Sequence, residues 1–222
     1  MTPIIYIGAF LRLFSAGTYF EAYPEETSQS ITFYGQHAVK FKEIGTAVKQ
    51  KGAFVYAIVA PEISQYSNVL NFFEAQSLKV LYIQGGKAFG NFSIGPFQMK
   101  PSFVETLEAQ IQKYPDLKKK YGHILIDKPD EREERKTRLM HLDELSWQFK
   151  YLKVFLALML KKKYAFSNDY NKLKFYATSY NAGFLKPKKS IEAEYQKARF
   201  PSFSNPKFNY AAIAIAFYKR VK

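Results

Sequence analysis

The most regular pattern of apolar residues in the chain lies between residues 142 and 159. Its members recur at steps of three and four, the spacing that places side chains on one face of an α-helix. They are Leu142, Leu145, Phe149, Leu152, Leu156 and Met159. Such a face is stable only when other elements cover it. The pattern therefore predicts a fold built by packing helices against one another.

Apolar residues over 46–60 also share one helical face, up to Pro61. Because proline lacks a backbone N–H and disfavours helix in the preceding residue, we expect this helix to end at Ala60. Further helices are predicted over 68–84 (closed by Gly85 and Gly86), 101–113, 168–180 (stopped by Gly183) and 206–221. Residues 20–45 have no regular period, and 114–138 are interpreted as a solvated, charge-dense loop that leads into a helix.

No internal repeat or clean linker interrupts this succession of helices. We therefore predict a mainly α fold in one compact domain over 1–222. Within it, 46–185 is the core that carries the motifs described below, and 186–222 is a C-terminal helical extension.

Residues 1–45 are interpreted as an N-terminal extension or, in part, as an export segment. An apolar run at 3–10 is followed by small residues at 15–17, as in export signals. However, no basic stretch precedes the run, and Arg12 interrupts it. An export signal and an ordinary N-terminal strand or helix therefore both fit this segment.

The composition excludes several kinds of chemistry. The chain has no Cys, which rules out disulfides and thiol catalysis. His37, His123 and His141 do not have the spacing of metal ligands, and no glycine-rich phosphate loop is present. The longest later apolar run, at 154–160, is too short to cross a bilayer. We expect neither a metal, nor a cofactor, nor a transmembrane segment, and the oligomeric state stays open.

The net charge of +14 favours a polyanionic partner. Charge alone does not choose among nucleic acid, an anionic membrane and an acidic wall polymer. The 17 tyrosines suit wet, polar binding grooves, including those that hold sugars, although they equally suit a packed core.

Three short motifs follow one another along the chain. The first is the VAPE segment, in which Glu62 comes at the end of an apolar helix. The second is SIGPFQ, with Ser93, Gly95 and Gln98, and the third is YNAG at 180–183, where another helix stops. Each motif places a polar side chain at the end of a predicted helix or within a turn, where a cleft could expose it.

In this order the motifs resemble the lysozyme-like superfamily, specifically the soluble lytic transglycosylases that cleave peptidoglycan. The resemblance covers roughly 46–185. It implies an α+β lysozyme-like fold with a sugar-binding cleft, in a periplasmic or secreted protein that acts on peptidoglycan glycan strands. It further implies that Glu62 is the catalytic residue. Substrate-binding roles would fall to Ser93, Gln98, Tyr180 and Asn181.

The sequence departs from the family pattern around the expected acid. Ile63 follows Glu62 where the family usually has Ser, and Ser64 comes next. The interval from Glu62 to Ser93 is also longer by about one helix, which we interpret as an insertion at 68–84. Glu74 is nearer to Ser93 and remains an alternative acid, but Glu62 has the apolar context that the role requires.

A carboxyl group in an apolar pocket has a raised pKa, which lets it donate a proton near neutral pH. The resemblance implies that one Glu acts first as acid and then as base, taking a proton from the sugar's own 6-hydroxyl. Phe97 and Met99 are expected in the core, whereas Tyr66 is a candidate for stacking on a sugar. Gly95 is expected to let a glycan approach the backbone.

Three other functions compete with this one. A hydrolytic lysozyme of similar fold would use water instead of the 6-hydroxyl. A non-catalytic peptidoglycan-binding protein would keep the fold without the reaction. A nucleic-acid binder is suggested by charge alone, with no recognition motif to support it, so we expect no nucleic-acid partner.

Overall fold

The computed structural model describes residues 16–69 and 72–222, and the side chains of 18–67 and 76–222. Within these ranges the fold is all-helical, with eleven α-helices, three short 3-10 helices and two isolated β-bridges. The mainly α class is therefore confirmed, while these residues do not include the sheet that an α+β fold would add. The candidate export segment and the side chain of Glu74 lie outside the described residues. No described helix combines the length and the apolar character needed to cross a membrane.

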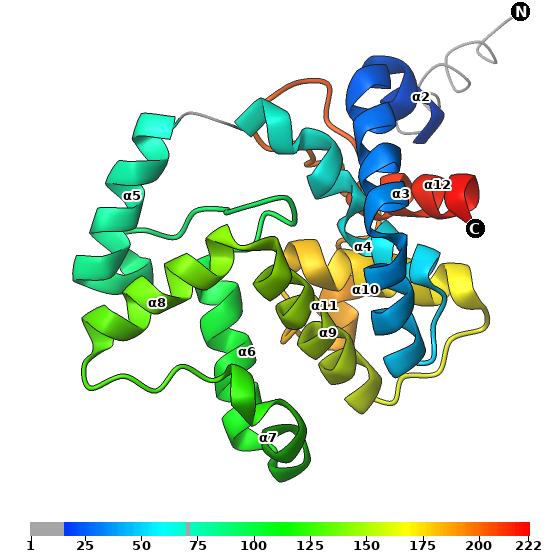
Figure 1. Cartoon of the computed structure of the whole chain (residues 1–222). Helices are drawn as coiled ribbons and strands as arrows, with labels where there is room; N and C mark the ends of the chain where they lie inside the picture. The colour runs from blue at the N-terminus through cyan, green and yellow to red at the C-terminus, as the bar shows by residue number, and fades with distance from the viewer. Residues whose placement is uncertain (1–15, 70–71) are drawn as a thin grey trace, which may run out of the picture. The chain divides into compact units, whose positions relative to one another are not determined.

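The described chain forms two compact units, which are coloured along the sequence in Figure 1. One unit comprises the described residues up to Gln65 together with Tyr164–Lys222, and the other runs from Tyr66 to Lys163. The single domain predicted over 1–222 stays a prediction.

The helices of the first unit are α2 (Ala16–Ala22), α3 (Pro24–Ala47), α4 (Gly52–Gln65), α10 (Asp169–Ala182), α11 (Lys188–Glu192) and α12 (Tyr210–Val221). Those of the second are α5 (Phe72–Gly85), α6 (Pro101–Lys113), α7 (Pro115–Tyr121), α8 (Glu131–Asp143) and α9 (Leu145–Lys161), with η1 (Tyr66–Val69), η2 (Gly86–Ala88) and η3 (Gly122–Ile124). The predicted helices at 101–113 and 168–180 are confirmed closely, and that at 206–221 begins later, at Tyr210.

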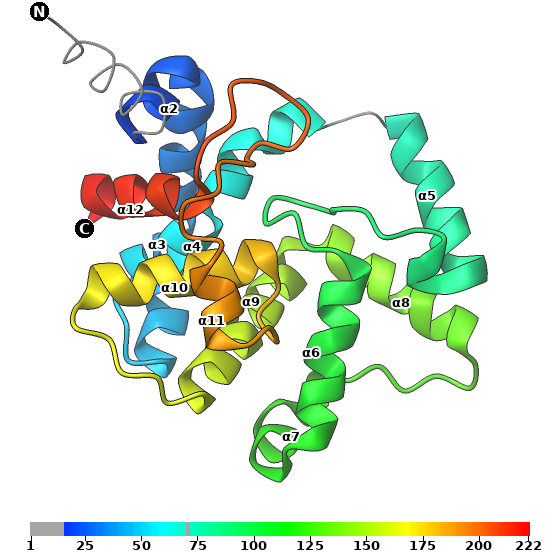
Figure 2. The same ribbon diagram turned by 180° about the vertical axis from the view of Figure 1, so that it is seen from behind.

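The first unit is built around α4. Every residue from Ala53 to Pro61 is buried, and nearly all of them are apolar. A helix that is apolar on all sides must be covered on all sides. Here α3, α10 and α12 pack against it, as Figures 1 and 2 show. The core of this unit therefore joins segments from both ends of the chain.

The predicted bounds of this central helix were wrong at both ends. The helical pattern from Thr46 is divided between two helices, because α3 ends at Ala47 and α4 begins at Gly52. Lys49 in the connecting turn has a positive φ of 55°, which a continuous helix does not allow. At the other end, α4 continues through Pro61 to Gln65 instead of stopping at Ala60.

The segment 20–45, which shows no regular period, is nevertheless helical over most of its length. It belongs mainly to α3, which has non-helical backbone angles at His37. The apolar period is weak because two of the buried residues of this helix are polar. Thr27 and Ser30 are buried before the kink, and Phe41 and Ile44 after it.

In the second unit, the apolar pattern of 142–159 is interrupted by a break at Glu144. Leu142 lies in α8, which ends at Asp143, and the remaining members lie in α9. Glu144 has an extended backbone (φ −96°, ψ 122°), so the predicted single helix was wrong at its start. Leu142 remains fully buried on the other side of the break.

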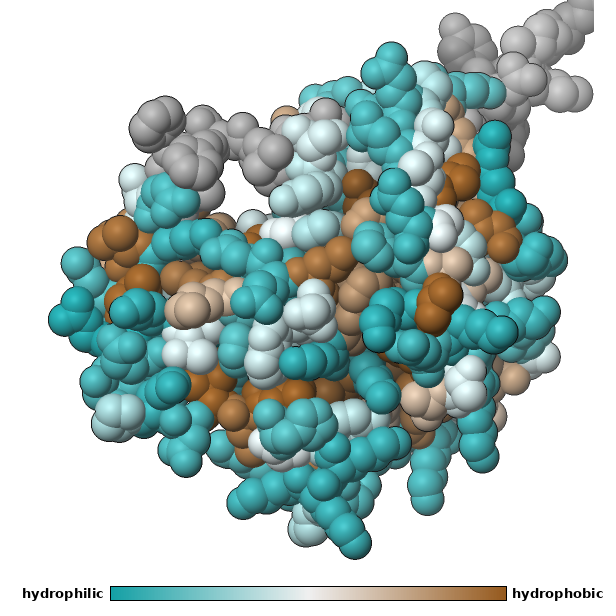
Figure 3. Space-filling model, viewed as in Figure 1, coloured by the Kyte–Doolittle hydropathy of each residue, from teal (hydrophilic) through white to brown (hydrophobic). Residues whose placement is uncertain are grey.

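The charged run at 114–138 is the expected loop only in part. The helices α7 and η3 occupy 115–124, the loop covers 125–130, and the expected helix start is that of α8 at Glu131. Asp130 caps α8 by accepting hydrogen bonds from the backbone N–H groups of Arg132 and Glu133, at 2.8 and 2.9 Å. Glutamates in the first turn of α8 also favour its N-terminal end. On the face drawn in Figure 3, hydrophilic side chains are widespread, with smaller apolar areas between them.

Arg138 is the exception within this charged run, because it is buried. Its guanidinium contacts the carboxylate of Glu108 on α6 at 2.6 Å and donates to the hydroxyl of Tyr82 on α5 at 2.8 Å. Tyr82 in turn donates to Glu105 at 2.8 Å. These bonds join three helices. Removing one partner would leave a buried charge uncompensated, at a cost of about 3–5 kcal/mol.

A second polar cluster of this unit surrounds Trp147, the only tryptophan of the chain. Its ring stacks on His141 with the centroids 3.4 Å apart, and the Nζ atom of Lys150 lies 3.6 Å from the centre of the Trp147 ring. His141 also forms a hydrogen bond of 3.1 Å with the hydroxyl of Tyr151. Burial, and then the positive charge of Lys150, lower the pKa of His141, while Glu144 opposes them.

We expect the tryptophan fluorescence to titrate with a midpoint below the usual histidine pKa of about 6.5, because a protonated imidazole stacked on indole quenches its emission. The unfolded chain takes up this proton at a higher pH than the folded chain. The free energy of unfolding should therefore be constant above pH about 6.5 and fall as the pH drops through the folded pKa. Fluorescence and urea unfolding over this range test both statements. The same fluorescence titration in a His141→Phe variant would contradict the assignment.

Candidate active site

Glu62 lies in the last turn of α4, between the buried residues Pro61 and Ile63. Its side chain is half-buried, so it lies at the edge of the apolar core of the first unit. The predicted context of Glu62, an apolar helix close to its end, is therefore present, although the helix does not stop at the proline.

Three carbonyl groups near Pro61 receive hydrogen bonds from side chains. Pro61 itself cannot donate to the carbonyl of Ala57, one turn earlier in the helix. The hydroxyl of Tyr210 donates to the carbonyl of Ile58 at 2.9 Å, and Ser30 donates to that of Ala60 at 3.1 Å. These bonds come from α12 and α3, so neighbouring helices hold the end of α4 in place.

Ser64, two residues after Glu62, completes this arrangement. Its hydroxyl donates to the carbonyl of Pro61 at 2.7 Å and lies 2.5 Å from the hydroxyl of Tyr19. Gln65 also donates to Tyr19, at 2.9 Å. All of these side chains are buried, so we assign Ser64 a role in holding the helix end.

Two buried tyrosines surround the predicted acid. Tyr180 on α10 is 8% exposed and Tyr210 on α12 is 4% exposed. Burial raises the pKa of both phenols, and the nearby charge of Glu62 raises each of them further. Both phenols therefore stay protonated near Glu62. The hydroxyl of Tyr210 already donates its proton to the carbonyl of Ile58, so of the two only Tyr180 can donate to the carboxyl group of Glu62.

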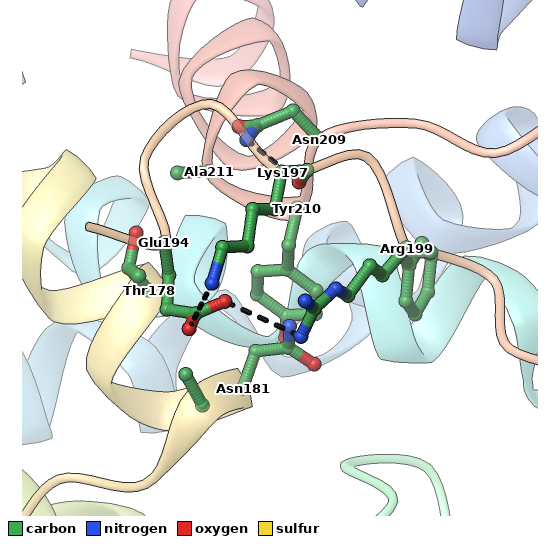
Figure 4. Close-up of a pocket in the computed structure, with 10 residues that line it drawn as sticks. Thr178, Asn181, Glu194, Lys197, Arg199, Asn209, Tyr210 and Ala211 are labelled. Atoms are coloured by element: carbon green, nitrogen blue, oxygen red, sulfur yellow. Dashed lines mark hydrogen bonds and ion pairs between the residues drawn. The ribbon is translucent and has the colours of Figure 1, made fainter. Parts of the chain in front are cut away.

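Asn181 follows Tyr180 and is exposed on the surface of α10. The helix ends one residue later, and Gly183 continues the chain with a φ of 107°, which L-residues rarely adopt. The predicted stop is thus confirmed. Asn181 and Tyr210 line one small pocket, drawn in Figure 4, whose other walls come from α10, from α12 and from the segment between α11 and α12.

The SIGPFQ segment lies in the second unit and forms a tight loop. Ile94 and Met99 pair as an isolated antiparallel bridge across it. Gln98 has a positive φ of 49°, and its side-chain amide donates to the carbonyl of Gly95 at 2.9 Å. Ser93 and Gln98 are half-buried. Phe97 and Met99, as expected, belong to the core.

The structure shows why residue 95 is a glycine, for a reason that the sequence did not suggest. Its φ is 67°, and a Cβ atom there would lie 1.6 Å from the side-chain nitrogen of Gln148. Gln148 is fully buried on α9. It accepts from the backbone N–H of Phe97 at 2.9 Å and donates to the carbonyls of Leu142 and Ile94, at 2.7 and 3.3 Å. The space beside Gly95, expected to admit a glycan, is occupied by this amide.

The structure thus places Glu62, Tyr180 and Asn181 in the first unit, and Ser93 and Gln98 in the second. Tyr66, the candidate stacking ring, opens η1 and is half-buried. Among the described residues, no group of three or more His, Asp or Glu side chains is arranged to hold a metal ion.

Sequence reasoning missed two residues of these sites. Gln148 is an uncharged polar residue next to the apolar face of α9, and that position was a signal for a buried amide. Tyr210 offered a weaker signal, because Asn209 before it is a favourable N-cap that places it in the first turn of a helix. Its bond to Ile58, 152 residues away, could not be read from the sequence.

No protein-family model matches the chain, and no curated protein and no solved structure is significantly similar to it. The resemblance to the lytic transglycosylases therefore depends on the three motifs alone.

We expect a Gly95→Ala variant to be destabilised by about 2–4 kcal/mol, since it needs a left-handed alanine and displaces a buried amide with three hydrogen bonds. Gly35→Ala is the matched control. Gly35 lies within α3 with no atom in the way of a Cβ, so alanine should be neutral or stabilise by up to about 1 kcal/mol. Urea unfolding followed by circular dichroism measures both. Equal effects of the two substitutions would contradict the assigned role of Gly95.

A Tyr210→Phe variant should lose about 1–2 kcal/mol of stability, because it removes a buried hydrogen bond to the carbonyl of Ile58 in α4. Tyr218→Phe is the control, since the Tyr218 hydroxyl has no hydrogen-bond partner among the described residues. Unfolding of both variants and the parent by urea gives the comparison. An unchanged Tyr210→Phe variant would show that the bond to Ile58 does not hold the helix.

Proposed function

We propose that the protein cleaves peptidoglycan as a lytic transglycosylase, with Glu62 as its acid. The observation that carries this proposal is the grouping of Glu62 with Tyr180 in the first unit, where the carboxyl charge raises the pKa of the buried phenol. The VAPE and YNAG motifs are far apart in the sequence. Their proximity is what the resemblance requires of the acid and the turn that faces it.

The chemistry requires Glu62 to give up its proton and then take one back. As acid, it protonates the glycosidic oxygen between MurNAc and GlcNAc, and the bond from that oxygen to C1 breaks. The resulting carboxylate then accepts the proton of the MurNAc 6-hydroxyl, whose oxygen bonds to C1. The products are a free GlcNAc hydroxyl and a 1,6-anhydro-MurNAc end, and Glu62 regains its proton.

The surroundings of Glu62 suit the first of these steps. A half-buried carboxyl beside an apolar helix loses hydration, which favours the protonated form that an acid needs. The buried phenol of Tyr180 can then stabilise the carboxylate that forms when Glu62 gives up its proton. In this proposal, Asn181 binds the glycan strand beside Glu62, and the binding roles of Ser93 and Gln98 in the second unit stay predictions.

The charge of the chain agrees with a wall substrate. A net charge of +14 attracts polyanionic material, and peptidoglycan carries peptide carboxylates. Action on peptidoglycan places the protein in the periplasm or outside the cell, and we propose this location together with the activity.

A hydrolytic lysozyme is the second candidate, and one observation favours testing it. Glu194 lines the same pocket as Asn181 and Tyr210, and a second carboxylate could activate water in a hydrolase. Its ion pairs with Lys197 and Arg199 lower its pKa, so it is ionised as a base must be.

We expect Glu62→Gln to lose at least about a hundredfold of the rate at which fragments are released from purified peptidoglycan, because the amide cannot donate the proton. Glu43→Gln is the matched control, since Glu43 is an exposed residue of α3 paired with Lys40. Mass spectrometry of the products then separates the two candidates. Anhydro-muramyl ends support the transglycosylase, whereas reducing ends together with loss of activity in Glu194→Gln support the hydrolase.

Binding without released fragments would overturn the enzyme proposal in favour of a non-catalytic peptidoglycan-binding protein. Thermal unfolding of each variant shows whether a loss of activity reflects a loss of folding.

A further inference from the structure

The small pocket at the start of α12 contains three charged residues that the proposed transglycosylase reaction does not use. It lies between the end of α10 and the segment that follows α11, entirely within the first unit. Figure 4 shows the side chains of Glu194, Lys197 and Arg199 extending toward one another from different sides, with Asn181 below and Tyr210 behind. Its volume is about 30 Å³, which suits a group of a few atoms rather than a sugar ring.

The segment that carries these charges is held firmly against α12. The side-chain amide of Asn209 donates to the carbonyls of Tyr195 and Lys197, at 2.9 and 3.1 Å, while its oxygen caps the helix by accepting from Ala212 at 2.8 Å. The backbone N–H of Arg199 donates to the carbonyl of Phe208 at 3.0 Å. The charged side chains therefore extend from a backbone that is fixed in advance, which lowers the entropy lost on binding.

The pocket contains more positive than negative charge. Lys197 pairs with Glu194 at 2.7 Å, and Arg199 approaches the other oxygen of the same carboxylate at 3.5 Å. Two cations thus pair with a single carboxylate. The Arg199 side chain remains 69% exposed, and one contact at 3.5 Å leaves most of its five N–H donors available to a ligand.

The remaining polar groups of the pocket fit an anion. The pocket lies at the N-terminal end of α12, where the helix dipole is positive. Asn181 contributes an exposed amide from α10, and it has no hydrogen-bond partner among the described residues. A planar guanidinium and a planar amide facing one space match a carboxylate, whose two oxygens lie in one plane.

We infer that this pocket binds a carboxylate of the substrate, held by the guanidinium of Arg199 and the amide of Asn181, with Lys197 adding to the positive field. The inference rests on the proposed function and sharpens its substrate. Glycan strands that carry peptides, whose carboxylates reach this pocket, are bound in preference to bare glycan. Glu194 limits the binding, because it competes with the ligand for the two cations.

The test uses the full chain with Glu62→Gln, which binds without cleaving, and two fluorescently labelled probes. One probe is soluble peptidoglycan strands with intact peptides, and the other is the same strands after carbodiimide coupling to methylamine has converted their carboxylates to neutral amides. Fluorescence anisotropy at a fixed salt concentration measures the dissociation constants. Adding Arg199→Ala should weaken binding of the peptide-bearing strands about tenfold and binding of the amidated strands only slightly.

Two further variants separate this site from a general effect of charge. Arg220→Ala removes an equal charge from the exposed end of α12, away from the pocket, and should weaken binding to both probes slightly and equally. Glu194→Gln should tighten binding of the peptide-bearing strands several-fold, because it releases the two cations.

Three results would contradict the inference or the proposed function on which it rests. If Arg199→Ala weakens binding of both probes equally, or weakens binding of the peptide-bearing strands no more than Arg220→Ala does, the carboxylate site is overturned. The proposal that the protein binds peptidoglycan then still stands. If Glu194→Gln weakens binding of the peptide-bearing strands, Glu194 does not compete with the ligand, and the carboxylate site is overturned. Binding of neither probe by the folded protein would overturn the proposed function itself.

Discussion

The complete burial of α4 is the constraint on which the first unit depends. Nine consecutive residues, from Ala53 to Pro61, are removed from water on every side of the helix, so no single neighbour could cover them. Helices from before and after it in the chain supply the cover: α3 on one hand, and α10 and α12 from the C-terminal part on the other. This requirement brings the YNAG turn, at the end of α10, into the same unit as Glu62.

Pro61 lies at the point where this buried helix leads into a polar residue, Glu62. Pro61 cannot donate a backbone hydrogen bond, so this stretch of the helix has one intrahelical bond fewer. Tyr210 and Ser30 donate to the carbonyls of Ile58 and Ala60, so two neighbouring helices hold the helix end. Glu62 follows directly, at the edge of the core and near the protonated phenols of Tyr180 and Tyr210.

In the second unit, Gln148 has a comparable role for the SIGPFQ loop. Its amide replaces regular secondary structure as the partner of three backbone groups, and Gly95 is the residue that makes room for it. Ser93 and Gln98 thus extend from a loop that a buried amide holds in shape. In both units a motif noticed for its polar residues is shaped by a hydrogen bond from a side chain that lies far away in the sequence.

The sequence alone determined the helical class, the helix at 101–113, the stop at Gly183 and the motifs, because these depend on local periodicity and on residues with restricted or unusual backbone angles. It predicted α4 and α9 with wrong ends, because local preferences do not contain the side-chain hydrogen bonds that Tyr210 and Ser30 donate near Pro61, or the one that Gln148 donates to Leu142 beside Glu144. It missed the helix α3 because two of its buried residues, Thr27 and Ser30, are polar and so interrupt the apolar pattern. Only the tertiary structure decided that Tyr210 accompanies Glu62 and that Arg199, Lys197 and Asn181 share one pocket, because these groupings follow from packing distant helices around a buried one.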